Sequence, residues 1–363
     1  MIERVALFAI VALIGVVLTV NLLYLLSTPT PNTWIWWAGD ETWVMSQYKT
    51  AISTGKYIFL FADGTTFTHG SGVLFGSCWL STLFYGLPSV LLQANPIDIG
   101  RAVTFCLGVG LLLSFYYTSI RYGIRPILAA SGALLMASSI CFFLVSHSCR
   151  SDLLIGATNF LLIAYLAKYL ESGLTTEKVV RVGFLTGGTL LVSGHVLVDC
   201  FLAIGYLLVE AGIVKRFRYL LLLAGVTAGS VGLFLLIQGV TIGSWSLMGP
   251  FQGNGGSLPI SHFFSPHGQI AIWLGHWFYV KEWATGYVWP SIVVLVGLAF
   301  STFFLRSDRF SFRTRPRWLI ASLLVVFATL FLELSLPRYL MYSLPILTLM
   351  LMMGVEYLLC HFP

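Results

Sequence analysis

An acidic pair flanked by two tryptophans stands in the first polar stretch of the chain, in the run Trp37-Ala-Gly-Asp40-Glu41-Thr-Trp43. A sugar transfer that inverts the anomeric centre needs a carboxylate to take the proton of the attacking hydroxyl. Tryptophan rings bind the faces of sugars and lower the local dielectric constant, which suits the same chemistry. A solvated loop with interfacial tryptophans explains the pattern equally well. Asp40 and Glu41 are thus candidate catalytic residues, and Trp37 and Trp43 are candidate substrate-binding residues.

A third acid opens an apolar segment, in the run Ser146-His-Ser-Cys-Arg150-Ser-Asp152. An arginine and an aspartate two residues apart at a helix start can hold a phosphate and orient a catalytic carboxylate. Taken alone, the run favours a simpler interpretation, in which Asp152 caps the next helix and Arg150 anchors at the membrane interface. In the catalytic interpretation, Asp152 supports the chemistry and Arg150 binds the donor phosphate.

A histidine and an aspartate lie within another apolar segment, in the run Ser193-Gly194-His195-Val-Leu-Val-Asp199. Because they are four residues apart, they share one face of a helix and can pair. Ionisable groups inside a membrane span are costly, so a functional role is favoured over chance. The alternative is a His–Asp pair that only tightens helix packing. His195 is a candidate substrate-binding residue.

A long polar stretch over residues 243–285 contains a glycine run and three histidines. The glycines lack the preceding strand and the Gly-Lys-Ser/Thr of a phosphate-binding loop. The histidines lack helical metal spacing, so no metal site is predicted. A solvated linker is favoured over a flexible outer loop that closes over substrate, in which Lys281 would contact the donor phosphate.

The last apolar segment is entered through Leu336-Pro-Arg338-Tyr339-Leu-Met-Tyr342. An arginine at the entrance of a span can neutralise a lipid phosphate, and Tyr339 can anchor at the interface beside the substrate. Snorkelling of Arg338 toward water explains the arginine about as well.

The elements that must position these residues are membrane helices. The chain has 363 residues, of which 58% are hydrophobic and 9% are charged. A soluble domain carries about 25% charged residues, so water cannot be the main solvent of this surface. Each apolar segment needs around 20 residues to cross a bilayer. The segments are 5–26, 71–92, 99–120, 126–145, 152–170, 183–213, 219–241, 286–305, 318–335 and 339–358.

The sequence therefore predicts an all-α polytopic membrane protein with about 8–11 membrane helices. Residues 1–363 form one membrane-embedded domain. Residues 27–70 form a first outer loop with juxtamembrane helices, and residues 243–285 form a second outer loop. The net charge of +6 resides in short loops rather than in a basic patch, so no nucleic-acid partner is predicted.

Two segments are irregular, and charge decides how they are arranged. Segment 71–92 is interrupted by glycines and a proline, and segment 183–213 is too long for one simple span. If 71–92 does not cross and 183–213 is a short hairpin, fourteen of the twenty Lys and Arg residues share one side. These are Arg4, Arg121, Arg125, Lys168, Lys178, Arg181, Lys215, Arg216, Arg218 and the five arginines of residues 306–317.

The positive-inside rule prefers this arrangement to one in which every segment crosses once. All five polar features described above then share the outer face, which makes that face the candidate active site.

In chain order these features resemble the C-type (GT-C) glycosyltransferases. They are similar especially to the branch of the dolichyl-phosphate-mannose protein mannosyltransferases and the bacterial lipid A aminoarabinose transferases. The resemblance rests on Gly39-Asp40-Glu41 after a first helix, Arg150-Ser-Asp152 at the start of a helix, Ser193-Gly194-His195 after a basic loop, and Arg338-Tyr339 with Pro345 at the last helix.

The resemblance implies that Asp40 is the catalytic base, that Asp152 supports the site, and that Arg150 and Arg338 receive the phosphate of a polyprenyl-phosphate sugar. It implies a GT-C-like helical bundle with an outer-face active-site loop. One departure is Thr68-His69-Gly-Ser-Gly72, which replaces a proline-rich start on the second segment; His69 is kept as a candidate substrate-binding residue.

The expected partners are a lipid-linked sugar donor, a glycan, lipid or protein acceptor, membrane lipids and a membrane partner subunit. No cofactor is expected, and a divalent metal is compatible but not required. The expected location is a bacterial inner membrane, with the active site facing outward. Two other functions stay open: a transporter or flippase for a lipid-linked or polar substrate, and a noncatalytic GT-C-like subunit.

Overall fold

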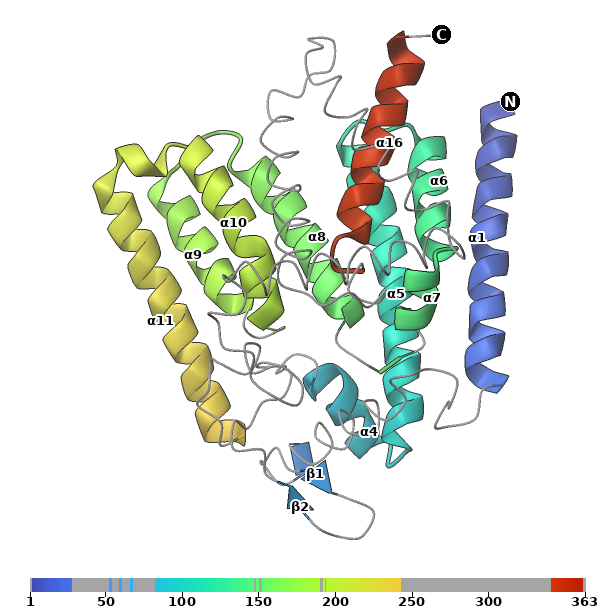
Figure 1. Cartoon of the computed structure of the whole chain (residues 1–363), viewed down its shortest axis with the longest axis horizontal. Coiled ribbons are helices and arrows are strands. Elements are labelled where there is room, and N and C mark those ends of the chain that lie inside the picture. Colours follow the sequence, from blue (N-terminus) through green and yellow to red (C-terminus); the bar gives the residue numbers. More distant parts are fainter. Residues whose placement is uncertain are drawn as a thin grey trace, which may run out of the picture.

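The computed structural model describes residues 2–27, 52–53, 59–60, 66–67, 82–146, 148–149, 152–189, 192, 194–242 and 341–361. Within these ranges the chain is almost wholly helical (Figure 1). One antiparallel pair of two-residue strands, β1 (Phe59–Leu60) and β2 (Thr66–Phe67), lies in the predicted first loop.

Four predicted spans are confirmed as helices that are long and apolar enough to cross a membrane. These are α1 (Ile2–Ser27), α5 (Pro96–Arg121), α8 (Asp152–Tyr169) and α11 (Phe217–Ile242). The last predicted span appears as α16 (Leu344–His361), which begins five residues later than expected. The predicted spans 286–305 and 318–335 lie outside the described residues.

The long segment 183–213 is a helical hairpin, as charge counting predicted. The first arm, α9 (Thr176–Gly188), begins before the predicted segment, and the second arm is α10 (Gly194–Glu210); the two run in opposite directions (Figure 1). The short 3-10 helix η3 (Ile213–Lys215) then leads into α11.

Two other apolar segments are broken rather than continuous. Segment 126–145 divides into α6 (Pro126–Ala137) and α7 (Ile140–Ser146). At the break, the Ser139 hydroxyl donates to the Met136 carbonyl (2.7 Å) and accepts from the Phe142 amide (3.2 Å). The described part of segment 71–92 is a π-helical turn, η1 (Thr82–Gly86), followed by α4 (Leu87–Leu91). At 1.5 Å per residue these ten residues cover about 15 Å, half of a bilayer core.

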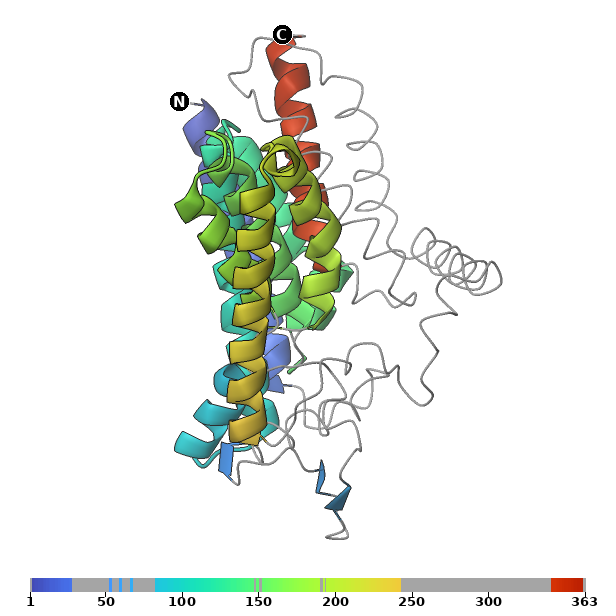
Figure 2. The same ribbon diagram turned by 90° about the vertical axis from the view of Figure 1, so that its left-hand side faces the viewer.

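Helix directions divide the bundle into two ends, and both views place the N- and C-termini at the same end (Figures 1 and 2). We call this the basic end. It holds the starts of α1, α6, α9 and α11 and the last turns of α5, α8, α10 and α16. Nine of the ten described Lys and Arg residues lie at these helix ends, and they are the described members of the set that charge counting grouped together.

Local signals explain why the chain turns at the basic end. Gly123, Gly173 and Gly212 follow α5, α8 and α10 and adopt φ values of 80°, 85° and 88°. This left-handed conformation costs glycine little and commonly ends helices. At the next helix start, the Thr175 side chain accepts a hydrogen bond from the Lys178 amide (3.3 Å) and so caps α9.

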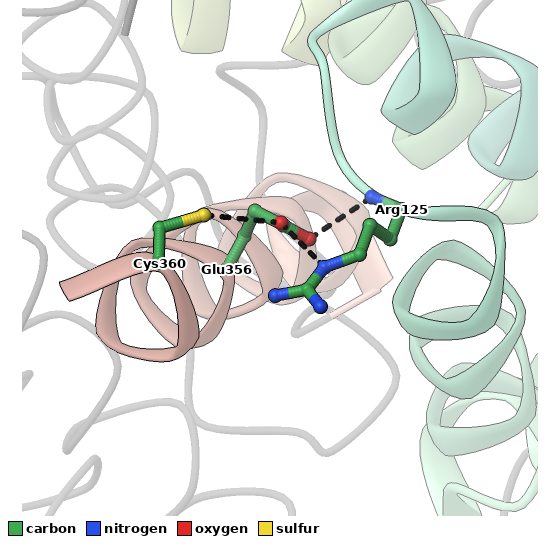
Figure 3. A network of polar contacts seen from close by, with 3 residues as sticks. All are labelled: Arg125, Glu356 and Cys360. Carbon is green, nitrogen blue, oxygen red and sulfur yellow. Dashed lines mark hydrogen bonds and ion pairs between the residues drawn. The ribbon is translucent and has the colours of Figure 1, made fainter. Parts of the chain in front are cut away.

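An ion pair ties the last helix to the α5–α6 turn at this end (Figure 3). The Arg125 Nε donates to Glu356 Oε1 at 2.7 Å, and the Arg125 backbone amide donates to Oε2 at 3.0 Å. The Cys360 thiol donates to the same Oε1 at 3.6 Å. Glu356 is only 5% exposed in its side chain, whereas Arg125 is 42% exposed. The carboxylate is thus buried and satisfied from three sides.

The core surrounds α8. In its most apolar stretch 61% of the residues are buried, against 6% in α1 and in α11. Phe160 and Ile163 of α8 are fully buried, while Phe8 of α1 and Leu221 of α11 are 76% and 59% exposed. Extended apolar surfaces of this kind are typical of contact with lipid. α8 is therefore the central helix, and α1 and α11 lie at the periphery (Figure 1).

Candidate functional site

The end of the bundle away from the termini, which we call the opposite end, gathers the starts of α8, α10 and α16 and the last turns of α1 and α11 (Figure 1). These helix ends flank every polar feature that the sequence assigned to the outer face. The described flanks of these features thus lie at one end of the bundle.

Most predicted site residues lie outside the described part of the chain. Asp152 is described in full, and His195 is placed only through its backbone, as the second residue of α10. The others remain predictions that the described residues do not test. They are Trp37, Asp40, Glu41, Trp43, His69, Arg150, Lys281, Arg338 and Tyr339.

Asp152 is the first residue of α8 and is 2% exposed. Its Oδ1 accepts a hydrogen bond of 2.9 Å from the hydroxyl of Tyr342, which is also 2% exposed. The bond joins two parts of the chain that are 190 residues apart. A carboxylate at a helix N-terminus is favoured by the helix dipole, and a buried carboxylate needs hydrogen-bond donors. The position at the start of α8 and the hydrogen bond from Tyr342 together hold the Asp152 side chain in one orientation.

Close packing fixes the segment that carries Tyr342 against α8. A Cβ added to Gly156 would overlap the carbonyl oxygen of Met341, so only glycine permits this approach. One helical turn farther on, the Asn159 amide donates to the carbonyl of Tyr342 at 3.4 Å. Two consecutive residues before α16 are thereby seated on one face of α8.

Tyr342 was missed as a functional candidate in the sequence. It belongs to the run 336–345 that was singled out for Arg338 and Tyr339, but no short-range pattern connects it with Asp152. The glycine at 156 was the available signal, since a glycine within the second turn of a buried helix marks a close approach of another backbone.

The two interpretations of Asp152 can now be compared. As a simple cap, its side chain would serve only the first backbone amides of α8. The Tyr342 bond instead links it to the entrance of the last helix, where Arg338 stands four residues earlier. The helix-capping interpretation alone therefore does not describe the contacts of Asp152.

The described residues contain no cluster of three His, Cys, Asp or Glu side chains that could hold a metal ion. The prediction that catalysis needs no metal is untested by this observation. Comparison of the chain with known protein families, with curated proteins and with solved structures finds no match.

Proposed function

We propose that this protein is a membrane glycosyltransferase of the GT-C type. It moves a sugar from a polyprenyl-phosphate donor to an acceptor hydroxyl at the opposite end of the bundle, with inversion of configuration. The observation that carries the proposal is the Asp152–Tyr342 hydrogen bond (2.9 Å), because it joins two segments that were nominated independently from the sequence.

Chain connectivity limits how far the proposed phosphate ligands can lie from this bond. Two residues span at most about 7 Å, so the Cα atom of Arg150 stays that close to the Cα atom of Asp152. Four residues span about 14 Å at most, which bounds the distance from Arg338 to Tyr342. Arg150 and Arg338 are each close in the chain to one partner of the Asp152–Tyr342 bond, so both could approach the same phosphate.

The proposed reaction divides the work among three groups. Asp40 takes the proton of the acceptor hydroxyl as its oxygen attacks the anomeric carbon. The bond from that carbon to the phosphate oxygen breaks, and the polyprenyl phosphate leaves as an anion. Arg150 and Arg338 stabilise the negative charge that develops on it. Asp152, held by Tyr342, positions Arg150 and the residues around it.

The proposal also sets the protein in its membrane. The basic end faces the cytoplasm, because Lys and Arg residues accumulate on that side of membrane proteins. The opposite end then faces outward, where the donor enters sideways from the outer leaflet. We propose that the helices cross a bacterial inner membrane several times.

The test is transfer of radiolabelled sugar from a panel of polyprenyl-phosphate sugars by the purified full chain. Wild type should transfer at least one of them, and Asp40→Asn should lose about 100-fold or more of the rate. The matched control is Asp98→Asn, an exposed aspartate in the first turn of α5 at the same end of the bundle. It should transfer at the wild-type rate.

Transfer by wild type and Asp40→Asn alike would keep the enzyme class and move the base to Glu41. Silence of every protein, with donor lipids still bound tightly, would overturn the proposal in favour of a transporter or a noncatalytic subunit.

A further inference from the structure

A cavity of about 680 Å³ opens at the basic end, far along α8 from the Asp152–Tyr342 bond. It lies between the last turns of α5 and α8 and the start of α9. The side chains that decide its chemistry are Thr118, Arg121, Tyr165, Lys168, Ser172 and Lys178. Three of these six are cations, and the other three present hydroxyl groups.

Lys178 is already committed to the fold. Its Nζ donates to the carbonyl of Tyr169 (2.6 Å), the hydroxyl of Ser172 (2.6 Å) and the carbonyl of Gly173 (2.9 Å). These bonds use all three of its N–H groups and satisfy the carbonyls at the end of α8. Lys178 therefore contributes charge to the cavity without a spare donor.

Arg121 and Lys168 differ from Lys178 in this respect. Both side chains are exposed, and neither side chain forms a hydrogen bond or an ion pair with another residue of the described ranges. The acids nearby are Glu171, whose charge adds to the rise that burial causes in the pKa of Tyr122, and Glu177, which pairs with Arg181 at 3.1 Å. The cations around the cavity outnumber these two acids, and within the described ranges the side chains of Arg121 and Lys168 use none of their donors.

The cavity also has an aromatic wall. The rings of Tyr165 and Tyr169 stack with centroids 5.2 Å apart, and the Arg181 guanidinium lies 5.3 Å from the centre of the Tyr169 ring. Tyrosines at the end of an apolar helix are typical of the membrane–water interface. The cavity thus has the aromatic lining that is typical of the headgroup level, and the apolar helices α5 and α8 continue from it.

We propose that this cavity binds the phosphate of an anionic phospholipid from the leaflet at the basic end. Arg121 and Lys168 bind the phosphate oxygens, Thr118 and Ser172 supply hydroxyl contacts, and the acyl chains lie along the apolar surfaces below. Basic pockets between membrane helices recognise anionic headgroups in this way. The site is separate from the proposed donor site, which lies at the other end of α8.

The test is lipid binding to the detergent-purified full chain, followed by native mass spectrometry with phosphatidylglycerol and phosphatidylcholine as the probes. Each interfacial cation contributes roughly a fivefold gain in affinity for an anionic lipid. The double variant Arg121→Gln/Lys168→Gln should therefore bind phosphatidylglycerol about 25-fold more weakly, with phosphatidylcholine binding unchanged.

The matched control is Arg4→Gln/Lys215→Gln. It removes one arginine and one lysine that are exposed at the same end but do not line the cavity. It should bind phosphatidylglycerol as wild type does. Equal losses in the two double variants, or no preference of wild type for phosphatidylglycerol, would overturn the proposal.

Competition with glycerol phosphate distinguishes the two sources of the phosphate. Failure of millimolar glycerol phosphate to displace the lipid supports a lipid site that uses the acyl chains. Displacement would overturn the lipid assignment and identify a site for a soluble phosphate ester. Thermal unfolding of both double variants checks that each one is folded.

Discussion

Two buried tyrosines mark the two ends of the bundle. At the basic end the Tyr122 hydroxyl donates to the backbone carbonyl of Ala164 at 2.8 Å. At the opposite end the Tyr342 hydroxyl donates to the carboxylate of Asp152 at 2.9 Å. Both bonds fasten α8 to a distant segment, yet only one places an ionisable acceptor in the interior. The neutral carbonyl of Ala164 is a sufficient acceptor for holding helices together. Packing alone therefore does not explain why the acceptor at the opposite end is the carboxylate of Asp152.

The ion pairs repeat the contrast. Charges at the basic end pair near water, where the Arg181–Glu177 pair is 50% and 76% exposed. Glu356 is the exception, because its carboxylate is buried, but its partner Arg125 still reaches solvent. In both ion pairs of the basic end, at least one partner is therefore exposed to water. At the opposite end, the neutral hydroxyl of Tyr342 donates to the buried acid Asp152.

The largest expected effect is at the Arg125–Glu356 pair. Arg125→Ala leaves the buried Glu356 carboxylate without its cation. The free energy of unfolding should fall by up to about 3 kcal/mol, the lower part of the range for removing one partner of a buried ion pair. Glu356→Gln leaves the Arg125 guanidinium, which water can solvate, so the free energy of unfolding should fall by only about 1 kcal/mol. Apparent melting temperatures in detergent give the comparison. Equal losses of melting temperature in Arg125→Ala and Glu356→Gln would mean that the two side chains do not differ in burial.

The next effect tests the close approach at the opposite end. Gly156→Ala places a methyl group against the Met341 carbonyl and should destabilise the protein by about 2 kcal/mol through overpacking. Gly110→Ala in α5 is the control, since nothing lies within 4 Å of its added Cβ. It should leave the melting temperature unchanged or slightly higher, because alanine favours helices. A tolerated Gly156→Ala would show that the segment before α16 is not fixed on α8.

A smaller effect depends on pH. Burial, aided by the charge of Glu171, raises the pKa of Tyr122 well above its ordinary value of 10.0. Above pH 10 the unfolded chain therefore loses this proton while the folded chain keeps it, so stability falls as pH rises. Between pH 10 and pH 11 the free energy of unfolding of wild type should fall by about 1 kcal/mol more than that of Tyr122→Phe. Parallel pH profiles of the two proteins would contradict the burial of this hydroxyl.

The smallest effect is expected at the exposed pair of α9. Glu177→Gln removes an ion pair between side chains four residues apart on the helix surface. Such pairs contribute about 0.3–0.5 kcal/mol, so the melting temperature should hardly move. A loss as large as that of Glu356→Gln would remove the distinction between buried and exposed charges at the basic end.

The helices were predictable because their signals are local. Long apolar runs define α1, α5, α8 and α11, and the excess length of segment 183–213 together with charge counting indicated the α9–α10 hairpin. The division of segment 126–145 was missed, because Ser138 and Ser139 interrupt an otherwise apolar run too weakly to stand out. At the break, the Ser139 hydroxyl donates to the Met136 carbonyl and accepts from the Phe142 amide in the first turn of α7.

The candidate site was predictable only in part. Asp152 was singled out because an acid at the start of an apolar segment is unusual. Its partner Tyr342 comes from the far end of the chain, and only tertiary packing selects one tyrosine among the sixteen of the sequence. The same holds for Arg125 and Glu356, whose partnership spans 231 residues.

The most direct test of the account compares Tyr342→Phe with Tyr122→Phe. Each variant removes one buried hydroxyl and should destabilise the protein by about 1–2 kcal/mol. The measurement is sugar transfer per folded molecule from the polyprenyl-phosphate donor that wild type uses. We expect a loss of about tenfold or more for Tyr342→Phe, because Asp152 loses its orienting donor, and no loss for Tyr122→Phe. Equal transfer by the two variants would contradict the assignment of the opposite end as the active end.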